Sequence, residues 1–222
     1  MHAIQQKNEV WEDNVIESIV DFAKAELGDL TYAYKLAQAV DEPYAMEKMI
    51  EFLSQSPQGQ KAFQERNILG DIDLHKLYRL PSNTLGYAFG KHMLDRGLKP
   101  LKSDALTVDN DAQFLGIHIK ETHDIWHVVI GADTDIPGEL QLEAFYVSQL
   151  YATRFWLALM VKNLLKSTID DIEASTQYMD VITKGWLIAK QAKPLFGIKW
   201  DELWEHPLEE VRADLNIVFP DI

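Results

Sequence analysis

Apolar residues recur every three to four positions along most of the chain, which is the period of an α-helix with one buried face. The pattern is clear over residues 15–23 and again over residues 46–53, where Asp41 and Pro43 favour a helix start. A break is expected at the Pro57-Gln-Gly59 segment that follows. No convincing strand pattern stands out, so the periodicity predicts an all-α protein.

The middle of the chain continues this helical pattern. Residues 69–79 predict a short helix and a connection, because Pro81 disfavours helical backbone at the residue before it. A further helix is expected over residues 82–96, with Ser82 or Asn83 as its N-cap. Both elements therefore belong to the helical body of the protein.

The second half of the chain carries the highest apolar density. Asp109 or Asn110 is expected to cap a helix that ends near Ile130. After a loop, residues 137–166 are predicted to form one helix that is apolar on all sides, as in the centre of a bundle. Residues 168–191 predict a last long helix, and shorter pieces follow it.

Length and composition agree with a single packed domain. The chain has 222 residues, of which 47% are hydrophobic and 25% are charged, so it can bury a sizeable core. We predict one all-α domain over residues 1–222, a helical bundle, with a separate N-terminal helical subdomain over residues 1–69 as the alternative. The net charge of −14 disfavours nucleic-acid binding and gives no general attraction to anionic lipid. Membrane contact would therefore have to be apolar or locally basic.

Two further features limit the location and the chemistry. Residues 1–9 are polar and lack the apolar core of a signal peptide. The most apolar window, residues 145–161, is shorter than the about 20 residues that span a bilayer and includes Gln149 and Arg154. We expect no transmembrane segment, and a location in the cytoplasm or, peripherally, on the cytoplasmic face of a membrane. The chain has no cysteine, which excludes disulfides, thiolate catalysis and cysteine-based metal sites.

The segment His123-Asp-Ile-Trp-His127 is the most informative stretch for chemistry. Residues four apart lie on the same face of a helix, so His123 and His127 can point at one cation. Asp124 lies about 100° further round the helix, where it is either a ligand at the edge or the acceptor that orients a ligating imidazole. A histidine pair at this spacing also occurs by chance among the seven histidines of the chain, as surface or core residues.

Glu139 follows His127 after a segment with acidic residues, a proline and two glycines that can turn the chain back. The glutamate would then stand in the first turn of the next helix and face the preceding one. Two histidines with one or two carboxylates suit Zn²⁺, Mn²⁺ or Fe²⁺, and further oxygen ligands favour Mg²⁺. Glu143, one turn beyond Glu139, is a candidate for a supporting carboxylate.

His123-Asp124-x-x-His127, followed by Glu139, resembles the signature of the ubiquinone-biosynthesis family known as coenzyme Q protein four. The resemblance covers about residues 80–217. It includes the segments Leu80-Pro-Ser-Asn-Thr84-Leu-Gly86, Thr122 to His127, Gly138-Glu139, Lys184-Gly-Trp186 through Ala192-Lys193, Trp200-Asp-Glu-Leu-Trp204, Pro207-Leu208, Val211-Arg212 and Leu215-Asn-Ile217.

This resemblance implies an all-α fold with a central apolar cavity for a polyprenyl tail. It implies a divalent metal held by His123, Asp124, His127 and Glu139. From the chemistry of carboxylates, Asp124 or Glu139 is also a candidate catalytic base where it is not committed to the metal. The implied activity is the oxidative decarboxylation of a prenylated hydroxybenzoate-type ring. A second view of the family is a non-catalytic, lipid-binding scaffold that organises the other quinone-biosynthesis enzymes at a membrane. Hydrolysis by a zincin-like site is a weaker reading, because Asp124 stands where that motif has glutamate.

The ligands implied for such a protein are a polyprenylated quinone precursor or another isoprenoid lipid, and a homodimer is an open alternative to a monomer. Arg79 and Lys120 are the candidates for binding an anionic head group, although such residues are often solvated surface charges. The candidate tail-lining residues, each of which also fits an ordinary core position, are Leu85, Tyr87, Phe89, Phe114, Leu115, Phe145, Leu150, Phe155, Trp156 and Leu159.

Overall fold

A computed structural model describes residues 2–26, 29–40, 43–101, 108–151, 153–170 and 172–221. Every regular element in these residues is a helix, which confirms the all-α class. The elements are α1 (His2–Lys24), α2 (Leu30–Ala39), α3 (Pro43–Leu53), α4 (Pro57–Glu65), α5 (Leu74–Leu77), α6 (Leu85–Asp95), α7 (Asp111–Ile130), α8 (Ile136–Gln149), α9 (Arg154–Asp170), a 3₁₀ turn (Ile172–Ala174), α10 (Ser175–Gln191), a 3₁₀ turn (Trp200–Leu203) and α11 (Leu208–Asp214).

One of the predicted N-caps is confirmed and one is wrong. Asn110 caps α7 by accepting the N–H of Gln113 at 2.9 Å, as expected. The cap of α6 is Thr84 rather than Ser82 or Asn83, because residues 81–84 form a turn that places the Thr84 hydroxyl at the first free N–H groups. Asp41, expected at the start of α3, lies outside the described residues.

Pro57 begins α4 instead of serving only as a break. Ser56 caps this helix by accepting the N–H of Gly59 at 2.9 Å. Proline is favoured in a first turn because its missing N–H has no partner to lose there. The prediction for this segment identified the interruption after α3 but missed the helix that follows.

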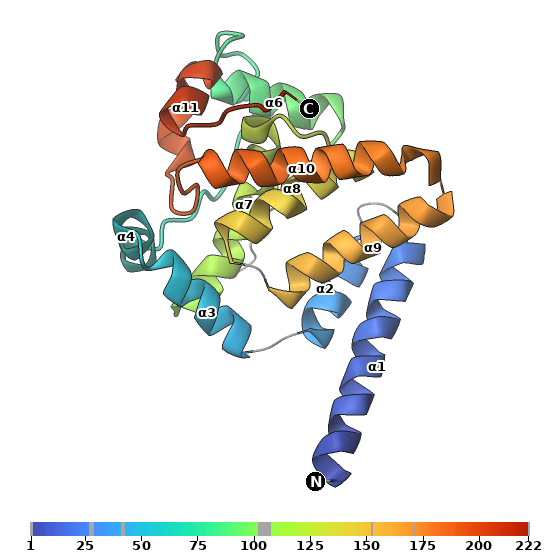
Figure 1. The fold of residues 1–222 in the computed structure, drawn as a ribbon. Coiled ribbons are helices and arrows are strands. Elements are labelled where there is room, and N and C mark those ends of the chain that lie inside the picture. The colour runs from blue at the N-terminus through green and yellow to red at the C-terminus, as the bar shows by residue number, and fades with distance from the viewer. Residues whose placement is uncertain are drawn as a thin grey trace.

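The helix predicted over residues 137–166 is two helices, α8 and α9. Tyr151 separates them with φ of 77°, a left-handed conformation that an α-helix cannot contain. The break changes the direction of the chain, so that α9 packs against α1 and α2 while α8 packs against α10. Figure 1 shows α10 lying over α8, on which it packs, and α1 extending away from the body of the molecule with the N-terminus at its far end.

Gly185 allows α8 and α10 to come unusually close. A Cβ atom at this position would lie 2.0 Å from the carbonyl oxygen of Gln141. The side chain of Gln141 in turn donates to the carbonyl of Ile130 at 2.9 Å, at the end of α7. Close packing at Gly185 therefore sets the position of the helix that carries Glu139.

We expect Gly185→Ala to lower the free energy of unfolding by about 2–3 kcal/mol, because backbone atoms on both helices must move apart. Urea unfolding followed by circular dichroism measures this change. Gly116→Ala in α7 is the matched control, since a Cβ there meets nothing within 4 Å and alanine favours helix. Equal stability of Gly185→Ala and the unchanged protein would contradict this packing.

The C-terminal segment supports the end of α7. Arg212 in α11 donates to the carbonyl oxygens of Val129 and Val128 at 2.9 and 2.8 Å, in the last turn of α7. The backbone N–H of Gly86 donates to the carbonyl oxygen of Trp204 at 2.9 Å, and a Cβ on this glycine would lie 2.8 Å from that oxygen. The segments around Gly86, Trp204 and Arg212 thus contribute packing that holds α6 and α7 in place. None of the helices in the described ranges is both long and apolar enough to cross a lipid bilayer.

Candidate metal centre

The predicted ligands meet where α7 ends and α8 begins. Gly131 terminates α7 in the left-handed conformation, with φ of 64°, and Asp135 caps α8 by accepting the N–H of Gly138 at 2.9 Å. Gly138 lets this turn close tightly, because a Cβ there would lie 1.9 Å from the carbonyl oxygen of Asp133. The turn returns Glu139 to the face of α7 that carries the two histidines.

Three of the four predicted ligands converge. The Nε2 atoms of His123 and His127 are 3.3 Å apart. Glu139 places one carboxylate oxygen 3.3 Å from Nε2 of His127 and the other 4.0 Å from Nε2 of His123. One ligand atom from each of the three residues lies within 4.8 Å of the others.

This donor set fits a divalent cation. Two nitrogens bound to one tetrahedral ion at about 2.0–2.1 Å stand about 3.3 Å apart. Two neutral imidazoles that point Nε2 lone pairs at one another repel unless a proton or a cation lies between them. The side chains of His123 and Glu139 keep 27% and 24% of their surface exposed, whereas His127 is fully buried, so the cluster is only partly enclosed.

Tyr146 contacts His123 at the ring nitrogen that does not face the cluster. Its hydroxyl lies 3.2 Å from Nδ1 of His123. When Nε2 faces the cation, Nδ1 carries the hydrogen and donates it to the tyrosine oxygen, which fixes the tautomer and the ring orientation. His127 is fully buried, its ring stacks on His92 at 6.2 Å, and its Nδ1 has no hydrogen-bond partner among the described residues.

Asp124, the fourth predicted ligand, lies outside this cluster of three. It is buried on α7, and burial raises the pKa of its carboxyl group while the neighbouring imidazoles of His123 and His127 oppose the rise. The structure therefore separates Asp124 from the three residues whose donor atoms converge. Its raised pKa suits a group that exchanges a proton.

Glu139 and His123 have the charge states that metal ligands need. Burial favours a higher pKa for Glu139, but the hydrogen bond with His127 and the charges of His123, His127 and Lys162 outweigh it and lower the pKa to about 2. Burial lowers the pKa of His123, with only partial opposition from Glu139. At neutral pH the site thus offers an ionised carboxylate and a neutral imidazole.

Glu143 is buried behind Glu139 in a polar network between α8 and α9. Asn163 donates to both of its carboxyl oxygens, at 2.9 and 3.1 Å, and Lys162 donates to the Asn163 side-chain oxygen at 2.6 Å. Burial, with the nearby charge of Glu139, raises the pKa of Glu143 to about 8 against the opposing influence of Lys162 and Asn163. Glu143 is thus a supporting carboxyl group.

We expect Glu143→Gln to flatten the pH dependence of stability. In the unfolded chain Glu143 loses its proton near its ordinary pKa of 4.5, whereas the folded protein keeps it up to about 8. The stabilising contribution is therefore complete below 4.5 and is lost as the pH rises toward 8, by at most about 1.4 kcal/mol per pH unit. Urea unfolding across this range should show a loss in the unchanged protein that Glu143→Gln lacks and the exposed control Glu209→Gln retains.

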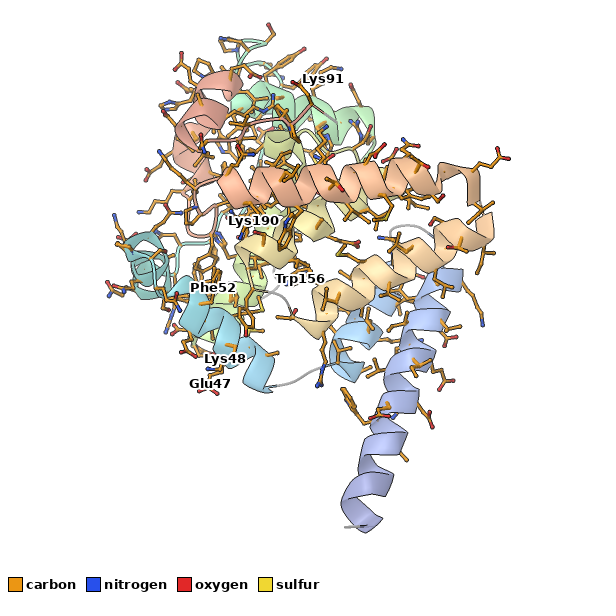
Figure 2. All side chains as sticks on the ribbon, viewed as in Figure 1. Glu47, Lys48, Phe52, Lys91, Trp156 and Lys190 are labelled. Atoms are coloured by element: carbon orange, nitrogen blue, oxygen red, sulfur yellow. The ribbon has the colours of Figure 1, made fainter. Side chains whose placement is uncertain are left out.

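An apolar cavity of about 390 Å³ lies between α2, α3, α7 and the start of α9. Two predicted tail-lining residues, Phe155 and Trp156, form part of its wall, and Lys120 also lines it. Trp156, labelled in Figure 2, stacks on Tyr146 at 4.6 Å between ring centres, and Tyr146 contacts His123. The inner wall of the cavity is thus two aromatic rings away from the ligand cluster.

The other predicted tail residues are distributed through the core. Tyr87 is half-buried and stacks on Tyr78, and Leu159 packs against both hydrophobic clusters of the protein. Arg79 is exposed and, within the described ranges, belongs to neither the cavity wall nor the ligand cluster. The tail residues that lie fully within the main core are Leu85, Phe89, Phe114, Leu115, Phe145 and Leu150.

Sequence reasoning missed Tyr146, Asn163 and Lys162 as parts of this centre. Tyr146 lies seven positions after Glu139, on the same face of α8, and this helical spacing was a usable signal. The sequence carried no such signal for Asn163 and Lys162, because the unpredicted turn between α8 and α9 is what brings them next to Glu143. His118 is a core histidine whose Nε2 accepts the N–H of Gly197 at 3.1 Å.

Fold and site together define an all-α protein with a two-histidine, one-carboxylate cluster close to an apolar cavity. The chain belongs to the Coenzyme Q (ubiquinone) biosynthesis protein Coq4 family, whose family model matches residues 6–221. The assignment confirms the resemblance found in the sequence.

Relatives extend over most of the chain. The mitochondrial ubiquinone biosynthesis protein COQ4 of Eremothecium gossypii is 26% identical over 84% of this chain, and that of Yarrowia lipolytica is 25% identical over 90%. The chain spans 58% of the length of the first of these and 76% of the second. A crystal structure from Nostoc punctiforme, named for ubiquinone biosynthesis, has a TM-score of 0.80 at 24% identity and covers 93% of this chain and 98% of its own, which shows the same fold.

Proposed function

We propose that the protein is a metal-dependent enzyme that binds a polyprenylated aromatic acid and removes its ring carboxyl group by oxidative decarboxylation. The observation that carries this proposal is the proximity of two features, a partly exposed three-ligand cluster and an apolar cavity that the rings of Trp156 and Tyr146 separate from it. A polar head and an insoluble tail on one molecule require this pair of features. The relatives named for ubiquinone biosynthesis support the same class of substrate.

His123, His127 and Glu139 would hold the metal, as Zn²⁺, Fe²⁺, Mn²⁺ or Mg²⁺. A bound divalent ion would supply a positive charge for the carboxylate and phenolic oxygens of the ring. Asp124, buried beside the cluster, holds or accepts the proton that the phenol exchanges. The cavity takes the tail, and each buried methylene group contributes about 0.8 kcal/mol, which holds the ring in place.

In the overall reaction, the aromatic carboxylic acid and water give carbon dioxide, two protons, two electrons and a phenol whose hydroxyl group stands where the carboxyl group was. The electrons go to an acceptor such as dioxygen. The test is release of labelled carbon dioxide from a prenylated hydroxybenzoate-type acid that carries the label in its carboxyl group, with metal content measured on the same sample. Metal-dependent release of labelled carbon dioxide supports the proposal. A protein that binds both the metal and the prenylated acid but releases no carbon dioxide refutes it.

The second candidate is a non-catalytic scaffold that holds a prenylated intermediate for other quinone-biosynthesis enzymes. Exposed apolar residues on α9, Leu157, Val161 and Ile169, favour a contact with a partner or a membrane surface. Complementation of a pathway-deficient strain separates the two candidates. Rescue by a folded Glu139→Gln variant would favour the scaffold, and failure of rescue with normal partner assembly would favour catalysis.

A further inference from the structure

Tyr146 belongs to both the ligand cluster and the aromatic packing beside the cavity. It is 2% exposed and lies in the last turn of α8. Its hydroxyl is 3.2 Å from Nδ1 of His123, and its ring stacks on Trp156 at 4.6 Å with 27° between the planes. The ring also packs against Trp126 at 5.0 Å. Tyr146 thus has one polar contact that orients a ligand, and its contacts with the two indole rings fix its own position.

Trp156 is the part of this chain of contacts that can respond to the cavity. It lines the cavity on one side and contacts Tyr146 on the other. Its indole N–H is buried and has no hydrogen-bond partner in the described part of the chain, so only packing fixes the ring. A ring that borders an unfilled space lacks contact atoms on that side, and an apolar occupant restores them.

We propose that Trp156 and Tyr146 couple the cavity to the ligand cluster, so that an apolar occupant of the cavity strengthens metal binding and the metal strengthens binding of the occupant. This inference rests on the proposed function for the identity of the two ligands. An occupant that packs against Trp156 holds Tyr146 against His123, which keeps the Nε2 lone pair directed into the cluster. Part of the cost of ordering the site is then already met when the metal arrives. Linkage makes the coupling reciprocal, with the same factor in both directions.

Tyr146 is a positioning residue in this scheme, since it acts through His123. Its coupling role differs from simple support of the fold. Support alone would change the affinities for the metal and for the cavity occupant, but neither affinity would depend on whether the other ligand is bound. Such dependence is measurable as the ratio of two metal affinities, with the cavity filled and unfilled. For coupled sites this factor is typically about 5–150-fold.

The experiment uses the full chain, Zn²⁺ and phytane, a saturated isoprenoid hydrocarbon with no head group that could touch the metal. Titration calorimetry gives the Zn²⁺ affinity with and without saturating phytane, and gives the phytane affinity with and without Zn²⁺. We expect phytane to raise the Zn²⁺ affinity about tenfold, and Zn²⁺ to raise the phytane affinity by the same factor. Tyr146→Phe removes one hydroxyl, and its coupling factor should fall to about one while Zn²⁺ binding weakens about tenfold.

Tyr87→Phe, outside both sites, is the matched control and should keep the full coupling factor. Independent binding of Zn²⁺ and phytane in the unchanged protein would overturn the coupling and leave the proposed function standing. Coupling that persists in Tyr146→Phe would also overturn it, since another path would then connect the sites. A protein that binds neither ligand would overturn both the coupling and the proposed function. Trp156→Phe, which keeps an aromatic ring, provides a second test with an expected reduction of the factor.

Discussion

His127→Ala should abolish metal binding and, with it, release of carbon dioxide from a prenylated ring acid. His127 is fully buried, and its Nε2 lies 3.3 Å both from Nε2 of His123 and from a carboxylate oxygen of Glu139. Removing it leaves one imidazole and one carboxylate, so the Zn²⁺ affinity should fall by at least about 100-fold. Elemental analysis of purified protein and a Zn²⁺ titration measure the loss.

Because a buried histidine is replaced, the fold of this variant must be tested separately. Glu139→Gln is the companion variant, since it keeps the size of a partly exposed side chain and removes only the charge. His75→Ala, at an exposed position in α5, is the matched control and should keep full metal content. Normal metal content in folded His127→Ala and Glu139→Gln would show that the cluster is not the metal site.

The sequence was most informative where chemistry depends on local geometry. The spacing of His123 and His127 needs only one helix, and the return of Glu139 needs one tight turn whose glycine and proline are visible in the sequence. The break at Tyr151 could not be predicted, because neither glycine nor proline marks it and the adjacent residues are apolar. Everything that depends on this break was therefore missed, including the pairing of Asn163 with Glu143.

The cavity could not be predicted from the sequence either. Its wall includes residues of α2, a helix for which no prediction was made, together with residues of α3, α7 and α9. Phe155 and Trp156 were among the predicted tail-lining residues, but the small residues that leave the space open give no signal in the sequence. An empty volume depends on the packing of distant helices, whereas a buried side chain can be recognised from its periodicity alone.

Gly116 gives the sharpest test of the cavity. It lies on α7 in the cavity wall, and a Cβ at this position meets no atom within 4 Å. Gly116→Phe should therefore fill part of the 390 Å³ space without disturbing the helix. If the ring displaces about four carbons of a bound tail, the loss is roughly 3 kcal/mol, or about 100-fold in affinity for the prenylated acid. The measurement is binding and turnover of a long-tailed acid beside the same acid with a single prenyl unit.

The long-tailed acid should lose this affinity, and the short one should keep most of its own, because the ligand cluster is unchanged. Gly116→Ala separates the effect of volume from that of helix propensity. It should stabilise α7 by about 0.5–1 kcal/mol and bind both acids as the unchanged protein does. Equal losses for both acids in Gly116→Phe would mean that the ring disturbs the ligand cluster. Full binding of the long-tailed acid would mean that the tail lies elsewhere, since no occupant of this space could ignore a phenyl ring placed in it.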